Sequence, residues 1–238
     1  MPRQDPDMAE ELGLFAQGYH AVAGLDEVGR GALAGDVVAA AVILPAQAAV
    51  LQRLYGVRDS KQLSPHQRFI LSAMIQAEAL AIGLGRVSAQ DIDRLGIVQA
   101  TRRAMVMAVA ALPVRPDYLI IDALRLPDLT IPQKAIIKGD ARCLSIAAAS
   151  IVAKVKRDAS MVDLDAIYPG YGFARHKGYG TSFHCQQLRL KHPCLIHRRS
   201  FAPVRAAEVV ADEAADEAAD EAADAGRSEA PCLTHVTV

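Results

Sequence analysis

The pattern that most constrains the fold is a series of short apolar segments, rich in valine and isoleucine and bounded by glycine or proline. The first two, 19–26 and 36–44, are predicted strands separated by a glycine-rich turn. Further strands are predicted at 80–87, 118–122 and 134–138, and helices at 64–79, 88–94, 97–112 and 145–157. Two successive strands followed by alternating helices and strands favour the α/β class, with a mixed β-sheet flanked by helices.

The length and composition suit one large core with short additions. The chain has 238 residues, of which 52% are hydrophobic, enough to bury one full domain. We expect an N-terminal extension at 1–18, a main domain with a C-terminal helical segment at 19–205, and a disordered acidic tail at 206–238. The tail repeats Ala-Asp-Glu-Ala, a low-complexity pattern whose stacked acids repel one another.

The cellular location is predicted from segments that the sequence lacks. No apolar run approaches the roughly 20 residues of a membrane-spanning helix, and the polar start of the chain does not resemble a signal peptide. The four cysteines form no Cys-x-x-Cys pair, and a chain of this size needs no disulfide. We therefore expect a cytoplasmic protein with reduced thiols and no membrane contact, and we expect it to be a monomer.

The charge is unevenly distributed. The formal net charge is -1, but residues 206–238 contain nine acids and one base. Residues 1–205 contain 25 Lys and Arg against 18 Asp and Glu, a net charge of +7. A basic body suits a polyanionic partner such as nucleic acid, although excess charge more often serves solubility alone.

Four acids are placed where strands end or turn. Asp26 and Glu27 lie where the first strand meets the glycine turn, Asp122 ends a buried strand, and Asp140 stands before a long helix. Each acid alone has a simpler explanation, as a turn or helix cap. Together they predict a site for a hard divalent cation, Mg²⁺ or Mn²⁺, because crowded carboxylates repel one another without one. Such a site suits phosphodiester hydrolysis with two metal ions.

Other motif-based interpretations fit less well. The spacing Gly29-x-Gly31-x-x-x-Gly35 resembles a dinucleotide-binding motif, but that motif must open a helix and here a strand follows. A phosphate-binding loop of the Walker type is excluded for this segment, because no Gly-Lys-Ser/Thr follows the glycines. Histidines and cysteines gather between His184 and His197, yet their spacing does not match a zinc site.

Seven motifs, in order, resemble those of the ribonuclease HII family and cover roughly 21–204. They are 24–31 (GLDEVGRG), 59–61 (DSK), 121–122 (ID), 138–140 (KGD), 146–154 (IAAASIVAK), 176–181 (HKGYGT) and 197–201 (HRRSF). The resemblance implies a ribonuclease H-like fold and four metal-binding, catalytic carboxylates: Asp26, Glu27, Asp122 and Asp140. It also implies that the loop Gly29-Arg30-Gly31 contacts the ribose 2′-hydroxyl at the RNA–DNA junction, with Tyr179 helping to select that junction.

Further substrate contacts are expected from motif and basic residues. The complete predicted substrate-binding set is Gly29, Arg30, Gly31, Ser60, Lys61, Arg142, Lys177 and Tyr179. The candidates for phosphate contacts, which position a duplex without recognising its sequence, are Lys61, Arg142, Lys154, Lys177, Arg198 and Arg199. Two positions depart from the family pattern. Asp36 adds a negative charge near the glycine loop, and Ala123 follows the third acid where glycine is usual.

The resemblance implies an endonuclease that hydrolyses the RNA strand of RNA/DNA hybrids and cuts at single ribonucleotides in duplex DNA, leaving 3′-hydroxyl and 5′-phosphate ends. The alternatives are another nuclease of this fold and a non-catalytic binder of RNA/DNA duplexes. The acids disfavour the binder, because carboxylates repel phosphate unless a metal intervenes. The related ribonuclease HIII is disfavoured because only about twenty residues precede the first strand, too few for its added N-terminal domain.

Overall fold

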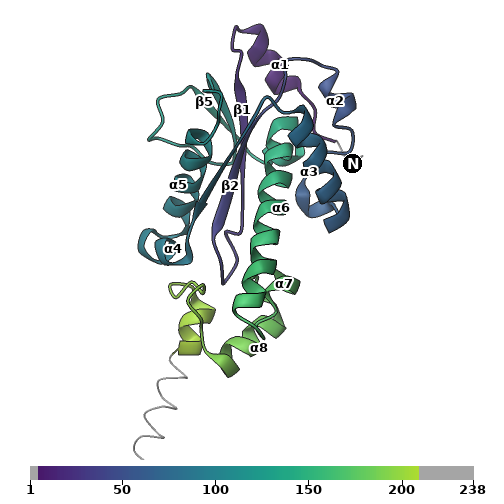
Figure 1. Cartoon of the computed structure of the whole chain (residues 1–238). Helices are drawn as coiled ribbons and strands as arrows, with labels where there is room; N and C mark the ends of the chain where they lie inside the picture. The colour runs from purple at the N-terminus through teal and green to yellow at the C-terminus, as the bar shows by residue number, and fades with distance from the viewer. Residues whose placement is uncertain (1–4, 209–238) are drawn as a thin grey trace, which may run out of the picture.

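The computed structural model describes residues 5–208, so most of the predicted acidic tail lies outside the described part of the chain. The main elements are labelled in Figure 1, and η marks a 3₁₀ helix. In chain order they are α1 (Ala9–Ala16), β1 (Val22–Val28), β2 (Val37–Ile43), α2 (Val50–Arg53), η1 (Ser60–Gln62), α3 (Pro65–Glu78), β3 (Ala81–Val87), α4 (Ala89–Leu95), α5 (Ile97–Ala110), β4 (Tyr118–Asp122), β5 (Gln133–Ile136), η2 (Gly139–Ala141), α6 (Leu144–Ile167), α7 (Phe173–His176) and α8 (Ser182–Lys191).

The sheet is mixed, as the sequence predicted, and its strand order is β3-β2-β1-β4-β5. The central strand β1 pairs antiparallel with β2 and parallel with β4. Helices α6 and α5 lie on opposite sides of the sheet (Figure 1). Alternate residues of β2 therefore face different cores: Val38 packs toward α6, whereas Val37 packs toward α5. Burial on both faces explains why β2 is almost continuously apolar.

Close helix-to-sheet contact depends on two glycines. A Cβ added at Gly24 of β1 would lie 2.4 Å from the side-chain oxygen of Ser145 in α6. A Cβ at Gly85 of β3 would lie 2.0 Å from the carbonyl oxygen of Ala104 in α5. The missing side chains let both helices approach the sheet to backbone contact, which fixes where α6 places its functional residues.

The first strand differs from its predicted bounds. β1 begins at Val22 rather than Tyr19, because the preceding N–H groups of His20 and Ala21 donate to the carboxylate of Asp117. β1 also continues to Val28, so the predicted acid pair lies inside the strand rather than at its end. Its two side chains therefore point to opposite faces of the sheet.

Helix α6 ends ten residues later than the sequence predicted, at Ile167 instead of Arg157. The added turns carry Met161, which is buried against Tyr171 and Phe173. These contacts come from residues that follow the helix, so the periodicity within the helix could not indicate them. α7 and α8 follow and form the small C-terminal helical part at the lower end of α6 (Figure 1).

The N-terminal segment packs onto the main fold through α1. Glu11 is buried, and its carboxylate accepts hydrogen bonds from the N–H and hydroxyl groups of Ser145 at 2.9 and 2.7 Å. Burial raises the pKa of the Glu11 carboxyl. Leu14 joins a core cluster with Val22 and Ile146. The predicted extension at 1–18 therefore includes a helix that contacts both β1 and α6.

Helix α3 begins with a capping box, in which the side chains of Ser64 and Gln67 each bond to the other's backbone. The Ser64 hydroxyl accepts from the N–H of Gln67 at 3.2 Å, and the Gln67 side chain accepts from the N–H of Ser64 at 2.9 Å. Pro65 occupies the first helical position. Across residues 5–208, no helix is both long and apolar enough to cross a membrane.

We expect Ser64→Ala to lower the free energy of unfolding by about 1 kcal/mol, because it leaves one helix N–H group without its acceptor. Ser64→Gly should cost only a few tenths of a kcal/mol, since glycine is also favoured at this position. Urea denaturation followed by circular dichroism measures both values. Equal losses for the two variants would mean that the cap contributes nothing specific.

Candidate active site

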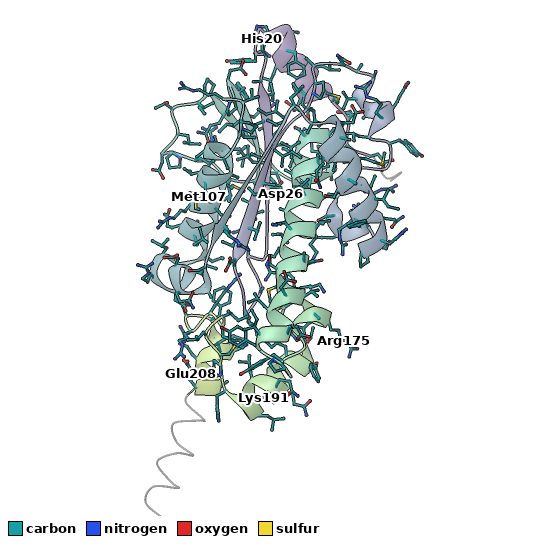
Figure 2. All side chains as sticks on the ribbon, in the orientation of Figure 1. His20, Asp26, Met107, Arg175, Lys191 and Glu208 are labelled. Atoms are coloured by element: carbon teal, nitrogen blue, oxygen red, sulfur yellow. The ribbon has the colours of Figure 1, made fainter. Side chains whose placement is uncertain are left out.

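A cavity of about 570 Å³ opens where the central strands β1 and β4 reach their carboxyl ends. It contains most of the residues predicted for the site. The predicted residues that line it are Asp26, Glu27, Gly29, Arg30, Gly31, Ser60, Lys61, Asp122 and Tyr179. Figure 2 shows Asp26 near the middle of the molecule, between the sheet and α6.

Strand register brings the first and third acids together. Leu25 of β1 pairs with Ile121 of β4 in parallel, so Asp26 and Asp122 are the next residues along adjacent strands. Asp140 reaches the same edge through η2, where the N–H of Gly139 donates to Asp122 Oδ1 at 2.7 Å. These contacts place acids that are far apart in sequence at one edge of the sheet.

The acids destabilise one another's charged forms. Burial is the largest cause that raises the pKa of Asp26 well above its usual value, and the charges of Glu27 and Asp122 raise it further. Burial also raises the pKa of Glu27, opposed by the neighbouring Arg30 guanidinium. Asp140 has a raised pKa because of burial and the nearby carboxylates of Asp59 and Asp122. A bound cation would relieve both the burial cost and the repulsion.

The donor set fits a hard divalent ion. Glu27 Oε2 is buried and has no hydrogen-bond partner among residues 5–208, so it can donate an electron pair to a metal. The four acids offer only oxygen ligands, which Mg²⁺ and Mn²⁺ prefer. Among the described residues, no three His, Cys, Asp or Glu side chains form a ready-made metal-binding cluster.

Two serines link the acid edge to the rest of the cleft. The hydroxyl of Ser150 in α6 donates to Asp26, which lowers the pKa of that carboxyl, and the Ser150 oxygen lies 2.9 Å from the hydroxyl of Ser60. Both serines are buried. Lys61, next in the chain, lies 3.7 Å from Asp140 Oδ2. The motif 59–61 therefore closes the side of the cleft opposite the sheet.

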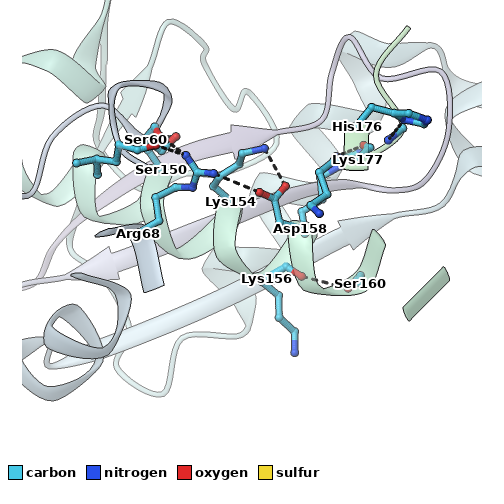
Figure 3. Close-up of polar contacts among 12 residues, drawn as sticks. Ser60, Arg68, Ser150, Lys154, Lys156, Asp158, Ser160, His176 and Lys177 are labelled. Carbon is cyan, nitrogen blue, oxygen red and sulfur yellow. Dashed lines mark hydrogen bonds and ion pairs between the residues drawn. The ribbon is translucent and has the colours of Figure 1, made fainter. Parts of the chain in front are cut away.

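A network of charges continues from these serines, and the sequence did not predict it (Figure 3). Arg68 of α3 donates to the carbonyl oxygen of Ser60 at 2.9 Å and lies 3.6 Å from Asp158. Lys154 contacts the same carboxylate at 2.8 Å. Arg68, Ser150 and Lys154 all line the cavity. Ser150, Lys154 and Asp158 are spaced four residues apart along α6, so the sequence could have indicated that they share one face of the helix. It could not indicate the contact with Arg68 of α3.

The glycine loop is held by two buried arginines. Gly29 has φ +93°, and a Cβ there would lie 2.2 Å from Nε of Arg157. Arg157 donates to the carbonyl oxygens of Ala34, Asp36 and Lys177 at 3.1, 2.9 and 2.8 Å. The second arginine, Arg198, donates to the carbonyl oxygens of Arg30 and Gly35. No heavy atom lies within 4 Å of a Cβ added at Gly31, so this part of the loop is open.

Tyr179 lies beside the glycine loop. Its backbone forms an antiparallel bridge with Ala32, and its side chain lines the cavity. The ring centroid lies 5.4 Å from the Arg157 guanidinium carbon and 5.6 Å from Lys154 Nζ, within the range of cation–π contacts. Two cations thus fix the ring at the edge of the cleft.

Two predicted substrate-binding residues lie away from this cavity. Arg142 lines a separate hollow and is 3.9 Å from Glu10. Lys177 lines an adjoining hollow of about 610 Å³ between α3, α6 and α7, and its ammonium group donates to the carbonyl oxygen of Ala174.

The two positions that depart from the expected motifs lie near the site. The carboxylate of Asp36 pairs with Arg86 at 3.3 Å. Ala123 adopts a left-handed conformation with φ 52°.

A mixed sheet with carboxylates at one strand edge, in a cleft bordered by lysine and arginine, defines a class of protein: the metal-dependent hydrolases that act on phosphodiesters. The family model "Ribonuclease HII" matches residues 23–204. The chain therefore belongs to the ribonuclease HII family, whose members depend on a divalent metal ion, and it is a ribonuclease H-type endonuclease.

Relatives and a solved structure agree with this assignment. Ribonuclease HII of Dehalococcoides mccartyi (strain 195) is 52% identical over 84% of this chain and 95% of its own length. Ribonuclease HII of Geobacillus kaustophilus is 54% identical over 83% of this chain and 74% of its own length. The crystal structure of ribonuclease H2 from Pyrococcus horikoshii superposes with a TM-score of 0.69 at 27% identity, covering 79% and 97% of the two chains.

Proposed function

We propose that this endonuclease hydrolyses the RNA strand of RNA/DNA hybrids and also cuts at single ribonucleotides embedded in duplex DNA. The observation that supports the proposal is that Asp26, Glu27 and Asp122 share one cavity with the Gly29-Arg30-Gly31 loop, while Asp140 lies beside Lys61 at the same edge. The acids supply the chemistry that a phosphodiester needs. The loop supplies close backbone approach to a sugar, at which the 2′-hydroxyl distinguishes RNA from DNA.

Asp26, Glu27, Asp122 and Asp140 would bind the divalent ions, and the choice between Mg²⁺ and Mn²⁺ is part of this proposal. Bound ions supply an activated water and stabilise the leaving oxygen. The protein itself contributes Ser150, which orients Asp26, and Lys61, which lies beside Asp140 and can contact a phosphate. Orientation of the acids by hydrogen bonds is what keeps a metal site in its active geometry.

Recognition of the substrate would divide between two parts of the cleft. The open backbone around Gly31 and the Arg30 side chain would contact the ribose, while the ring of Tyr179 would stack on the neighbouring sugar or base. Ser60, Lys61 and Lys154 would face the phosphates. Arg142 and Lys177 lie outside the cavity, so we propose that they contact flanking parts of the duplex.

We expect the protein to cut a labelled DNA duplex at its single ribonucleotide when Mg²⁺ or Mn²⁺ is present, and to leave an all-DNA duplex intact. Tyr179→Ala should lower kcat/KM for that substrate by about tenfold or more, since one base–aromatic stack is worth about 1–3 kcal/mol. Arg30→Ala should have an effect of similar size, since a hydrogen bond from a charged group is worth about 1.5–3 kcal/mol. Arg115→Ala, an exposed arginine at the opposite end of β4, is the matched control and should match the wild type.

The same assay separates the alternatives. Cutting of both duplexes would indicate a nuclease of this fold that does not recognise ribose. Binding without cutting would indicate a non-catalytic duplex binder, which four carboxylates beside a polyanion disfavour. The monomeric state and the cytoplasmic location stay predictions from the sequence.

A further inference from the structure

Three histidines form a buried group beneath the cleft, and the proposed reaction does not use them. They are His176 of α7, His184 of α8 and His197 of the following segment. His176 and His184 stack with ring centroids 4.4 Å apart, and Nε2 of His184 lies 3.1 Å from Nε2 of His197. Their exposed fractions are 9%, 0% and 2%, so water cannot satisfy their nitrogens.

The hydrogen bonds of this group allow only one arrangement of protons. His184 Nδ1 faces the carbonyl oxygen of Tyr179 at 3.0 Å, so this nitrogen carries the proton and Nε2 is an acceptor. His197 Nδ1 accepts from the N–H of Cys194 at 2.9 Å, so its proton is on Nε2 and points at His184. His176 likewise accepts from the N–H of Gly178 and donates to Tyr171. Each ring is neutral and uses both nitrogens.

The group joins the two segments that would recognise ribose. His184 donates to the backbone of Tyr179, and His176 accepts from the residue before it, Gly178. The backbone of residues 196–198, which include His197, pairs with that of residues 33–35, directly after the glycine loop. The loop before Tyr179 is strained, since Lys177 and Gly178 have φ values of 53° and 80°. A strained loop needs such contacts to persist.

We propose that His184 and His197 are positioning residues for ribonucleotide recognition: His197 fixes the tautomer of His184, and His184 holds Tyr179 at the edge of the cleft. This inference rests on the function proposed above. An apolar side chain could fill the same volume, but it could not donate to the Tyr179 carbonyl oxygen. The hydrogen bond, rather than the packing, is therefore the functional element.

The arrangement persists at neutral pH and fails in acid. Burial lowers the pKa of His184 and that of His197 to about 4, so both rings stay uncharged at pH 7. Their neutral forms stabilise the fold fully above pH 6.5, and this contribution is lost as the pH falls from 6.5 toward 4. The other titratable or charged groups around the three rings are Asp165, Tyr171, Arg175, Lys177, Cys194 and Arg199.

Two pairs of variants separate positioning from packing. The amide of asparagine can replace a histidine Nδ1–H, and that of glutamine can replace an Nε2–H. His184→Asn and His197→Gln each keep the required donor, whereas His184→Leu and His197→Leu remove it. The readout is the ratio of kcat/KM for a single-ribonucleotide duplex to kcat/KM for an RNA/DNA hybrid. His66→Asn changes an exposed histidine on α3 and is the control.

We expect the two leucine variants to lower this ratio about tenfold, and the asparagine and glutamine variants to stay within about threefold of the wild type. Equal losses in each pair would overturn the proposal and reduce the group to packing. If a leucine variant does not fold, the asparagine and glutamine variants decide the test. A tenfold loss of the kcat/KM ratio in His184→Asn, with normal cleavage of the hybrid, also overturns the proposal.

A spectroscopic measurement tests the geometry without activity. Long-range ¹H–¹⁵N NMR of the wild-type protein should show a proton on Nδ1 of His184 and on Nε2 of His197 at pH 7, with neither ring titrating above about pH 5. The reverse tautomers, or a charged ring at pH 7, would overturn the proposal. The expected tautomers in a wild-type protein that ignores single ribonucleotides would instead refute the proposed function.

Discussion

Asp26→Asn is expected to lower kcat by on the order of a thousandfold or more while the protein stays folded. We propose Asp26 as a direct metal ligand, and such a ligand matters more than the surrounding groups, whose loss typically costs 10–100-fold. Asparagine keeps the shape of the side chain but lacks the negative charge that a divalent ion needs. Steady-state cleavage of an RNA/DNA hybrid in Mg²⁺ and in Mn²⁺ measures the effect.

The same variant should not lose stability. Burial and neighbouring acids raise the pKa of Asp26 well above its usual value, so its charged form opposes folding at pH 7. Removing the charge should leave the metal-free Tm equal to or above that of the wild type. Asp128→Asn, on an exposed turn, is the control for a lost carboxylate. Wild-type rates in Asp26→Asn would refute the metal site.

Arg157→Leu should lower the free energy of unfolding by about 3–5 kcal/mol, because it leaves three carbonyl oxygens without the donor that they share. Only 1% of Arg157 is exposed, so water cannot replace the guanidinium without rearrangement. Such a loss is a large part of the 5–15 kcal/mol that stabilises a typical domain. Guanidinium-chloride denaturation followed by circular dichroism measures it.

The size of the effect identifies its cause. Arg157→Lys keeps the charge and part of the hydrogen bonding, so it should lose less stability than the leucine variant. Arg175→Leu, an exposed arginine of α7, should change stability by less than about 0.5 kcal/mol. If Arg157→Leu is equally mild, the glycine loop does not depend on this side chain.

Local sequence patterns sufficed for most of the fold. The continuous apolar run of β2 and the Ser64-Pro65 start of α3 each have a local cause, namely burial on both sheet faces and helix capping. The predicted bounds of β1 and α6 were wrong because residues distant in the sequence determine where these elements start or end. Asp117 determines where β1 starts, and the residues packed on Met161 prolong α6.

The site was predictable only in part, for a similar reason. The cavity contains nine of the twelve predicted site residues, and Asp140 reaches the same edge through Lys61 and Asp122. Arg142 lies at a separate hollow, which the sequence could not indicate, because a basic residue beside a motif says nothing about the direction of its side chain. The charge network through Arg68 and Asp158 joins two helices, so no spacing within one segment could reveal it.

Helix α6 has a consequence for how this protein can vary. One helix supplies Ser150 to the acid edge and Arg157 to the glycine loop, and these positions are seven residues apart, or about 10.5 Å along the axis. The helix therefore fixes the distance between the acid edge and the glycine loop. An insertion of one residue between these two positions would rotate everything beyond it by about 100° and separate the two functions.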